Sequence, residues 1–236
     1  MTVAFIVVLF VISILIAVIE ISIYNKKHHK FHGYKHASKK LEKNGLYNGI
    51  VAFGSARIPN DNPHIKEIEE ISELCAKRIV EKNKKISFIT GDGPSVMTAW
   101  LKPAAKIGIQ TAGFAITLPF EEKTSGYSDE KISYTFTNFP ARKQVMFDHA
   151  MAYVVFKGGF GTMDELFNLL VYITTGRAEK KPIFVYPKDF YKDVLNFNEF
   201  LKNKTIGEDG ANLLTYFNTK EELLNALYKI IDESVE

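Results

Sequence analysis

The stretch from Lys157 to Glu165, Lys-Gly-Gly-Phe-Gly-Thr-Met-Asp-Glu, constrains the fold of this chain more than any other. The apolar run 150–156 precedes it and predicts a buried parallel strand, and apolar residues at helical spacing follow from Leu166 to Ile173. The glycines therefore lie at a strand-to-helix turn, where a backbone without Cβ atoms can approach a ligand closely. The amide groups and the positive dipole end of a helix start favour an anion, above all a phosphate.

The side chains around this turn favour a ligand site over a turn required only by packing. A tight turn under packing demands would use the same glycines, so the glycines alone are a weak signal. Thr162 adds a hydroxyl group, and Glu165 follows one turn into the helix, where it can face the same ligand. We therefore expect a phosphate-bearing ligand with a carboxylate beside it.

The chain is long enough to bury a full core. It has 236 residues, 46% of them hydrophobic, which suits one large α/β domain or a domain with an appendage. The net charge of +3 is too small to indicate a nucleic-acid partner. The single cysteine, Cys75, excludes an internal disulfide and a cysteine-based zinc site. Four of the six histidines lie between residues 28 and 36, but no acid or cysteine completes a ligand set, so no metal is expected.

The N-terminus predicts a membrane anchor over residues 1–24. Val3 to Ile19 carries no charge, and with the residues to Tyr24 the run is about long enough to span the hydrocarbon core as a helix. A buried helix of the domain is an alternative, but the apolar run is continuous rather than periodic. A cleaved signal peptide would have a basic start and a small-residue cleavage site, and neither is visible.

The next residues, 25–44, form an expected basic linker. Six lysines between residues 25 and 40 place this side of the membrane in the cytoplasm by the positive-inside rule. The expected layout is a single-pass anchor in the cytoplasmic membrane, this linker, and a domain over residues 45–236 that faces the cytoplasm.

Within that domain, apolar runs alternate with helical patterns. This alternation predicts an α/β, Rossmann-like fold: a mainly parallel sheet with helices on both faces. The expected strands are 49–53, 86–90, 111–118, 132–137, 150–156, 183–186 and 213–217. The expected helices are 64–82, 96–107, 139–150, the one that begins at the glycine turn, 190–200 and 220–233.

Three of the expected strands end in glycine turns. These are Gly54-Ser55, Gly91-Asp92-Gly93, and Gly158 to Thr162. Because the carboxyl ends of parallel strands share one edge of the sheet, we expect the three turns to converge on one phosphate-bearing ligand. None of them is a P-loop or a complete dinucleotide-binding fingerprint.

Two adjacent cations, Arg142 and Lys143, begin the helix before the main glycine turn. Cations are unfavourable at a helix N-terminus, so an anionic ligand or Glu165 is expected to compensate them. An exposed basic pair is the alternative, and it fits Lys143 better than Arg142.

Together these motifs resemble the LONELY GUY (LOG) family, whose members are often labelled lysine-decarboxylase-like. The resemblance runs from Gly49 to about Tyr186 and rests on Leu118-Pro119-Phe120-Glu121, Arg142-Lys143, and Gly158-Gly159-Phe160-Gly161-Thr162-Met163-Asp164-Glu165. It implies a Rossmann-like homodimer or larger assembly. The implied reaction is hydrolysis of the N-glycosidic bond of a nucleoside 5′-monophosphate, such as AMP or a cytokinin riboside monophosphate. The implied products are a free base and ribose 5-phosphate, with no metal or organic cofactor.

The resemblance also implies roles for single residues. Arg142 and Glu165 match the catalytic pair. The implied substrate contacts are Lys143, Gly158, Gly159, Gly161 and Thr162, with Gly54, Ser55, Gly91 and Gly93 in matching turns and Glu121 as a looser match. Three positions depart from the family pattern: Lys157 replaces a proline, and Asp92 and Ser95 replace glycines of the second turn.

Two other functions remain open from the residues. One is a nucleotide sensor or carrier without hydrolysis, since related Rossmann-like proteins bind phosphorylated cofactors such as molybdopterin through similar turns. The other is a membrane-tethered interaction module whose glycine turns are purely structural. A carboxylate such as Glu165 favours the enzyme, because cleavage of an N-ribosyl bond develops positive charge that a carboxylate stabilises.

Overall fold

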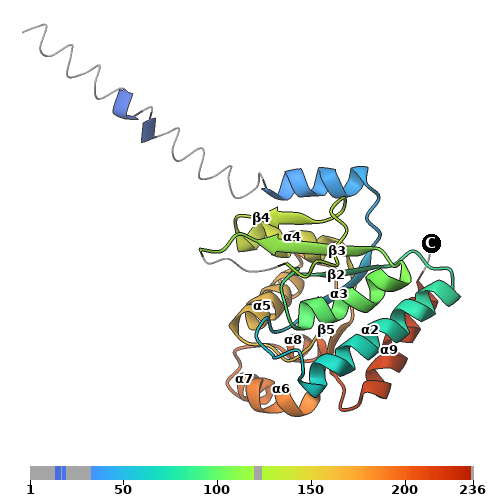
Figure 1. Ribbon diagram of the computed structural model, residues 1–236. Coiled ribbons are helices and arrows are strands. Elements are labelled where there is room, and N and C mark those ends of the chain that lie inside the picture. The colour runs from blue at the N-terminus through green and yellow to red at the C-terminus, as the bar shows by residue number, and fades with distance from the viewer. Residues whose placement is uncertain (1–13, 17, 20–32, 120–123, 235–236) are drawn as a thin grey trace, which may run out of the picture.

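The computed structural model describes residues 14–16, 18–19, 33–119 and 124–234. Within these residues, seven strands form one sheet in the order β4-β3-β2-β1-β5-β6-β7, and every neighbouring pair is parallel. Figure 1 shows helices on both faces of the sheet. The strand order reverses direction at β1, which is flanked by β2 and β5, as in doubly wound folds. The predicted Rossmann-like α/β fold is confirmed.

The elements follow the predicted alternation closely. The strands are β1 (Gly49–Phe53), β2 (Ser87–Thr90), β3 (Thr111–Ile116), β4 (Tyr134–Phe136), β5 (Ala150–Val155), β6 (Ile183–Val185) and β7 (Leu214–Tyr216). The longer helices are α2 (Pro63–Glu81), α3 (Val96–Ile107), α4 (Phe139–Asp148), α5 (Phe160–Thr174) and α9 (Lys220–Glu233). The shorter ones are α6 (Lys188–Val194), α7 (Phe197–Lys202) and α8 (Glu208–Ala211).

The core has two halves, one on each face of the sheet. In β1 alternate side chains divide between them: Val51 and Phe53 join the cluster beneath α4 and α5, while Ile50 and Ala52 join the one beneath α2, α3 and α9. A strand buried on both faces is mostly apolar. This is why the central strands β1 and β5 appear in the sequence as continuous apolar runs.

The helix predicted over residues 190–200 is wrong, because the chain forms two short helices there. Leu195 adopts an extended backbone, with φ −123° and ψ 103°, and ends α6. Asn196 then caps α7 by accepting a hydrogen bond from the Glu199 N–H through its side chain. Asn196, a residue type that favours helix N-caps, was the signal in the sequence for this break between the two helices.

Residues 33–43 form a further helix beside β4 and α4 (Figure 1). Ala37 and Leu41 are fully buried in the core, and Nζ of Lys40 donates to the carbonyl oxygens of Glu130 at 2.6 Å and Ser133 at 2.8 Å. The sequence places these residues in an exposed basic linker. Ala37 and Leu41 are an apolar pair at helical spacing, but the many lysines and histidines around them make the segment appear polar throughout.

Most of the predicted anchor, residues 1–24, lies outside the described residues. Of that segment, residues 14–16 and 18–19 are described, and both short stretches are helical. Among the described residues there is no helix with the length and apolar character needed to cross a membrane.

Candidate active site

A cavity of about 260 Å³ opens at the carboxyl edge of the sheet, between the turn after β1 and the start of α5. The predicted site residues that line it are Gly54, Ser55, Gly159, Gly161, Thr162, Arg142 and Glu165. Two of the three glycine turns thus meet at one cavity. The expectation that all three turns converge there is wrong for the second turn, Gly91-Asp92-Gly93, none of whose residues lines the cavity.

Arg142 lies on α4, which begins where the Asn138 side chain accepts the Ala141 N–H at 3.0 Å. The guanidinium of Arg142 is buried and makes three hydrogen bonds. Nε donates to the carbonyl oxygen of Phe114 at 2.6 Å, Nη2 to that of Gly91 at 3.2 Å, and Nη1 to Oε1 of Glu165 at 3.1 Å. Arg142 therefore joins the end of β2, strand β3 and helix α5. In the described part of the chain, one N–H on each terminal nitrogen keeps no partner.

Glu165 lies on the first turns of α5 and is buried beside Arg142. Burial raises the pKa of Glu165 above its ordinary value, and the positive charge of Arg142 opposes that rise. Asp164 raises the pKa of Glu165 further through its negative charge. A carboxylate with a raised pKa is a stronger base once ionised, which suits proton transfer.

The glycines at positions 91 and 158 do not line the cavity, and each is needed for close packing. A Cβ atom at Gly91 would overlap Nη2 of Arg142, and one at Gly158 would overlap the side chain of Thr162. These two glycines therefore make room for site side chains rather than for a ligand.

Lys143 also lies away from the cavity wall. Its Nζ is 2.8 Å from both carboxylate oxygens of Asp164, one residue before Glu165. The two cations at the start of α4 are thus compensated by two successive acids of α5. The ion pair of Lys143 holds α4 against α5 and orients the helix that carries Glu165.

The second turn faces the long loop between β3 and β4 instead of the cavity. The carboxylate of Asp92 accepts hydrogen bonds from the Ser125 hydroxyl and, at 3.0 Å, from the Ser128 hydroxyl. Gly93 is absent from the cavity wall, and its N–H donates to Sδ of Met97 at 3.3 Å. Glu121, the looser match for a substrate contact, lies outside the described residues.

Sequence reasoning missed much of the cavity wall. The additional lining residues are Ala56, Arg57, Met97, Ile116, Leu118, Phe139 and Phe160. Arg57 follows the first turn directly and is exposed, so its position was a usable signal for an anion contact. Phe160, between two glycines, is 97% exposed, which is unusual for so large an apolar side chain.

No metal site accompanies these residues in the described part of the chain. Nowhere in it do three or more histidine, cysteine, aspartate or glutamate side chains gather closely enough to hold an ion. What the cavity does offer is a helix N-terminus for an anion and a buried carboxyl–guanidinium pair.

Comparison with known proteins gives one family and one fold. The family model described as "Possible lysine decarboxylase" matches residues 97–227. Two solved structures of the molybdenum cofactor carrier protein of Chlamydomonas reinhardtii share 18% and 19% sequence identity with this chain, with TM-scores of 0.51 and 0.53. Each match covers 79% of this chain and 99% of the carrier protein.

A third solved structure is the molybdenum cofactor binding protein of Rippkaea orientalis. It is 18% identical, with a TM-score of 0.49, and the match covers 78% of this chain and 95% of that one. The likeness to the Chlamydomonas reinhardtii carrier protein, at 18% and 19% identity, shows a shared fold and nothing further. Among curated proteins, no match was found.

Proposed function

Because this chain belongs to the family described as "Possible lysine decarboxylase", we propose that it carries out the LOG-type reaction of nucleotide hydrolysis. The proposed substrate is a nucleoside 5′-monophosphate such as AMP or a cytokinin riboside monophosphate, and the products are the free base and ribose 5-phosphate. The observation that carries the proposal is the buried Arg142–Glu165 pair, which lines a cavity at the start of α5.

The 5′-phosphate binds at the N-terminus of α5 in this proposal. Gly159, Gly161 and Thr162 border the cavity there, and the first amide groups of a helix have no partner within the helix. The exposed guanidinium of Arg57 lines the same cavity and can pair with a phosphate oxygen. Binding the phosphate positions the ribose against Glu165, so its binding energy contributes to the chemical step.

Glu165 supports cleavage in two ways. Its carboxylate stabilises the positive charge that develops on the ribose ring as the bond from C1′ to the base nitrogen breaks. It also takes a proton from the attacking water, whose oxygen forms the new bond to C1′, and that proton passes to the departing base. Arg142 holds the carboxylate in place, and its two remaining N–H groups are available to the substrate.

The test is to incubate the full-length protein with AMP and other nucleoside monophosphates and to measure free base and ribose 5-phosphate. Glu165→Gln should lower the rate by more than about 100-fold, because it removes the base while keeping the shape of the side chain. Glu73→Gln, on the exposed part of α2, is the matched control and should leave the rate unchanged. Full activity in Glu165→Gln would contradict the proposal.

A carrier of a phosphorylated cofactor is the second candidate. It is favoured by the fold shared with the molybdenum cofactor carrier protein, at TM-scores of 0.51 and 0.53. Under this alternative the same cavity binds the phosphate and nothing is cleaved. Nucleotide or cofactor binding without release of base from the wild-type protein would support the carrier.

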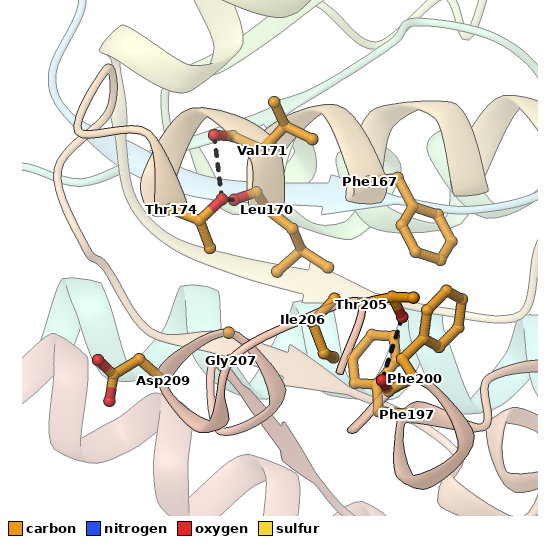
Figure 2. A pocket seen from close by; sticks show the side chains of 11 residues that line it. Phe167, Leu170, Val171, Thr174, Phe197, Phe200, Thr205, Ile206, Gly207 and Asp209 are labelled. Atoms are coloured by element: carbon orange, nitrogen blue, oxygen red, sulfur yellow. Dashed lines mark hydrogen bonds between the residues drawn. The ribbon is translucent and has the colours of Figure 1, made fainter. Parts of the chain in front are cut away.

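We also propose that the protein is a homodimer or larger homo-oligomer and that α5 forms the interface. Phe160, Phe167 and Val171 recur at coiled-coil spacing on α5 and are 97%, 38% and 53% exposed. Figure 2 shows Phe167 and Val171 beside a groove whose other wall includes Phe197 and Phe200 of α7. Val171→Glu should turn the assembly into a monomer in sedimentation experiments, and an unchanged assembly would exclude this interface.

The membrane location is a further proposal. The uncharged run over residues 3–19 and the lysines after residue 24 support a single-pass anchor, residues 1–24, with the domain, residues 45–236, in the cytoplasm. Deletion of residues 1–24 should move the protein from the membrane fraction to the soluble fraction. Full-length protein that is soluble without detergent would contradict the anchor.

A further inference from the structure

His64 is a buried histidine on the first turn of α2, outside the cavity wall. Its side chain is only 4% exposed and packs against the rings of Phe156 and Tyr186, with centroid distances of 6.1 Å and 5.9 Å. Its own N–H donates to the cap residue Asn62 at 3.0 Å, which fixes the backbone that carries the ring. A buried imidazole needs partners for its ring nitrogens.

The hydrogen bonds of the ring define its protonation. Nε2 accepts the backbone N–H of Lys157 at 3.4 Å, so Nε2 carries no proton, and the neutral ring has its proton on Nδ1. Nδ1 faces Oε2 of Glu67 at 3.5 Å, and the Tyr186 hydroxyl donates to the same oxygen at 3.1 Å. Within the described residues Nδ1 has no hydrogen bond of good geometry. The Lys157 amide is therefore the main polar contact of the imidazole.

Lys157 connects this histidine to both turns of the candidate site. It immediately precedes the glycine turn, and its carbonyl oxygen accepts the Ser55 N–H at 3.0 Å. The Ser55 carbonyl oxygen in turn accepts the Val96 N–H at 3.2 Å, at the start of α3. Ser55 and Gly159 both line the cavity. The peptide groups on either side of Lys157 are thus held by His64 on one side and the first turn on the other.

We propose that His64 is a positioning residue: by accepting the Lys157 N–H, it fixes the peptide that joins the two ligand-binding turns of the cavity. Its effect on nucleotide binding rests on the proposed function, whereas its effect on the geometry of the turns does not. A protonated ring would carry a hydrogen on Nε2 and would lose the acceptor that Lys157 requires.

The surroundings keep the ring in the required neutral form. Burial lowers the pKa of His64 to about 4, the nearby charge of Lys157 contributes to this lowering, and Glu67 opposes both effects. Glu67, Lys157 and Tyr186 are the charged or titratable groups that face the ring. At neutral pH His64 is therefore an acceptor throughout.

His64→Leu keeps the apolar packing and removes the acceptor, so the Lys157 N–H has no partner and the turn shifts. We expect the KM for AMP to rise about tenfold, in the range that an unsatisfied polar group costs, while kcat changes less than about threefold. His64→Gln supplies an amide oxygen as a new acceptor and should restore most of the affinity. A purely structural histidine would give the same result with leucine and glutamine.

Lys157→Pro provides a background without the donor. In this background His64→Leu should have no further effect on KM, because the hydrogen bond is already gone. An equal effect of His64→Leu in both backgrounds, or an unchanged KM in His64→Leu itself, would overturn the proposal.

Nuclear magnetic resonance of ¹⁵N-labelled full-length protein separates this proposal from the proposed function. The ring nitrogens should show an unprotonated Nε2 at pH 7, and His64→Leu should shift the amide signals of Lys157 and Ser55 more than His64→Gln does. If AMP is neither bound nor cleaved, the proposed function is wrong, but the amide signals still test the positioning role of His64. A protonated Nε2, or unchanged Lys157 and Ser55 signals in His64→Leu, would overturn that positioning role.

Discussion

Nη1 of Arg142 and Oε1 of Glu165, 23 residues apart in the chain, are joined by a hydrogen bond of 3.1 Å inside the protein. The same guanidinium also donates to two backbone carbonyl groups of neighbouring strands, Phe114 within β3 and Gly91 just after β2. Arg142 thus positions the carboxylate relative to the sheet edge as well as neutralising it. Mutation can separate the positioning role of Arg142 from its electrostatic role, because stability and activity depend on different contacts of its guanidinium.

Arg142→Ala should destabilise the protein by about 3–5 kcal/mol. The change leaves the Glu165 carboxyl buried without its Arg142 partner and removes a charged donor from the carbonyl groups of Phe114 and Gly91. Denaturation by urea measures this loss. The double variant Arg142→Met with Glu165→Leu should recover much of it, since apolar replacement of a buried ion pair is often close to neutral. Equal stability of the single and double variants would show that the unpaired carboxyl is not the cause.

The rate of nucleotide cleavage should fall on the acid side of neutrality, at a pH above the ordinary glutamate pKa of 4.5. Burial raises the pKa of Glu165, so the carboxyl becomes protonated and inactive at a higher pH than an exposed one would. Asp164→Asn removes a negative charge that raises this pKa and frees the Lys143 cation. It should move the acid limb of kcat/KM to lower pH. A shift to higher pH would contradict this electrostatic assignment.

Stability should also decline with acid because of His64. Its pKa is about 4 in the folded protein, against 6.5 for an ordinary histidine, so the unfolded chain binds the proton first. The contribution of His64 to stability is therefore present above pH 6.5 and is lost as pH falls toward 4. The difference between the two pKa values corresponds to roughly 3 kcal/mol.

His64→Gln should remove this part of the pH dependence. The difference between this variant and the wild type separates the contribution of His64 from that of His149, whose pKa is also lowered by burial. Thermal unfolding measured from about pH 4 to about pH 7 provides the difference curve. A difference that does not change with pH would mean that His64 titrates normally in the folded protein.

Gly91→Ala should reduce the proposed activity by more than about 100-fold without any change to a ligand-lining residue. The added Cβ meets Nη2 of Arg142, so the guanidinium must leave its place beside Glu165. Gly33→Ala is the matched control, since a Cβ there comes no closer than 3.7 Å to the nearest side chain, an ordinary contact. Base release and a crystal structure of the variant would measure both effects. Normal activity in Gly91→Ala would show that Arg142 tolerates displacement.

The central strands of the sheet were predictable because strands such as β1 and β5 are buried on both faces. Such strands are mostly apolar, and glycine turns marked the ends of β1, β2 and β5. The candidate pair was predictable from the spacing of Arg142 and Glu165 along a recognisable family pattern. These features are carried by short stretches of the sequence.

Features that depend on contacts distant in the sequence were not predictable. Asp92 looks like an anion at a phosphate-binding turn, yet it is held by Ser125 and Ser128 of another loop. His64 resembles any core histidine until the fold brings the Lys157 amide to it. Gly91 is needed by a side chain 51 residues away, and no local pattern carries that information.

The helix over residues 33–43 determines where the chain before it is attached to the domain. Two of its side chains contact residues that precede strands: the Tyr34 hydroxyl donates to Asp148 just before β5, and Lys40 donates to Glu130 and Ser133 just before β4. The cavity lies at the opposite edge, where the strands end. Under the proposed anchoring, a tether attached at residue 33 would therefore act on the edge of the sheet where the strands begin. The cavity at the other edge would stay open to dissolved ligands.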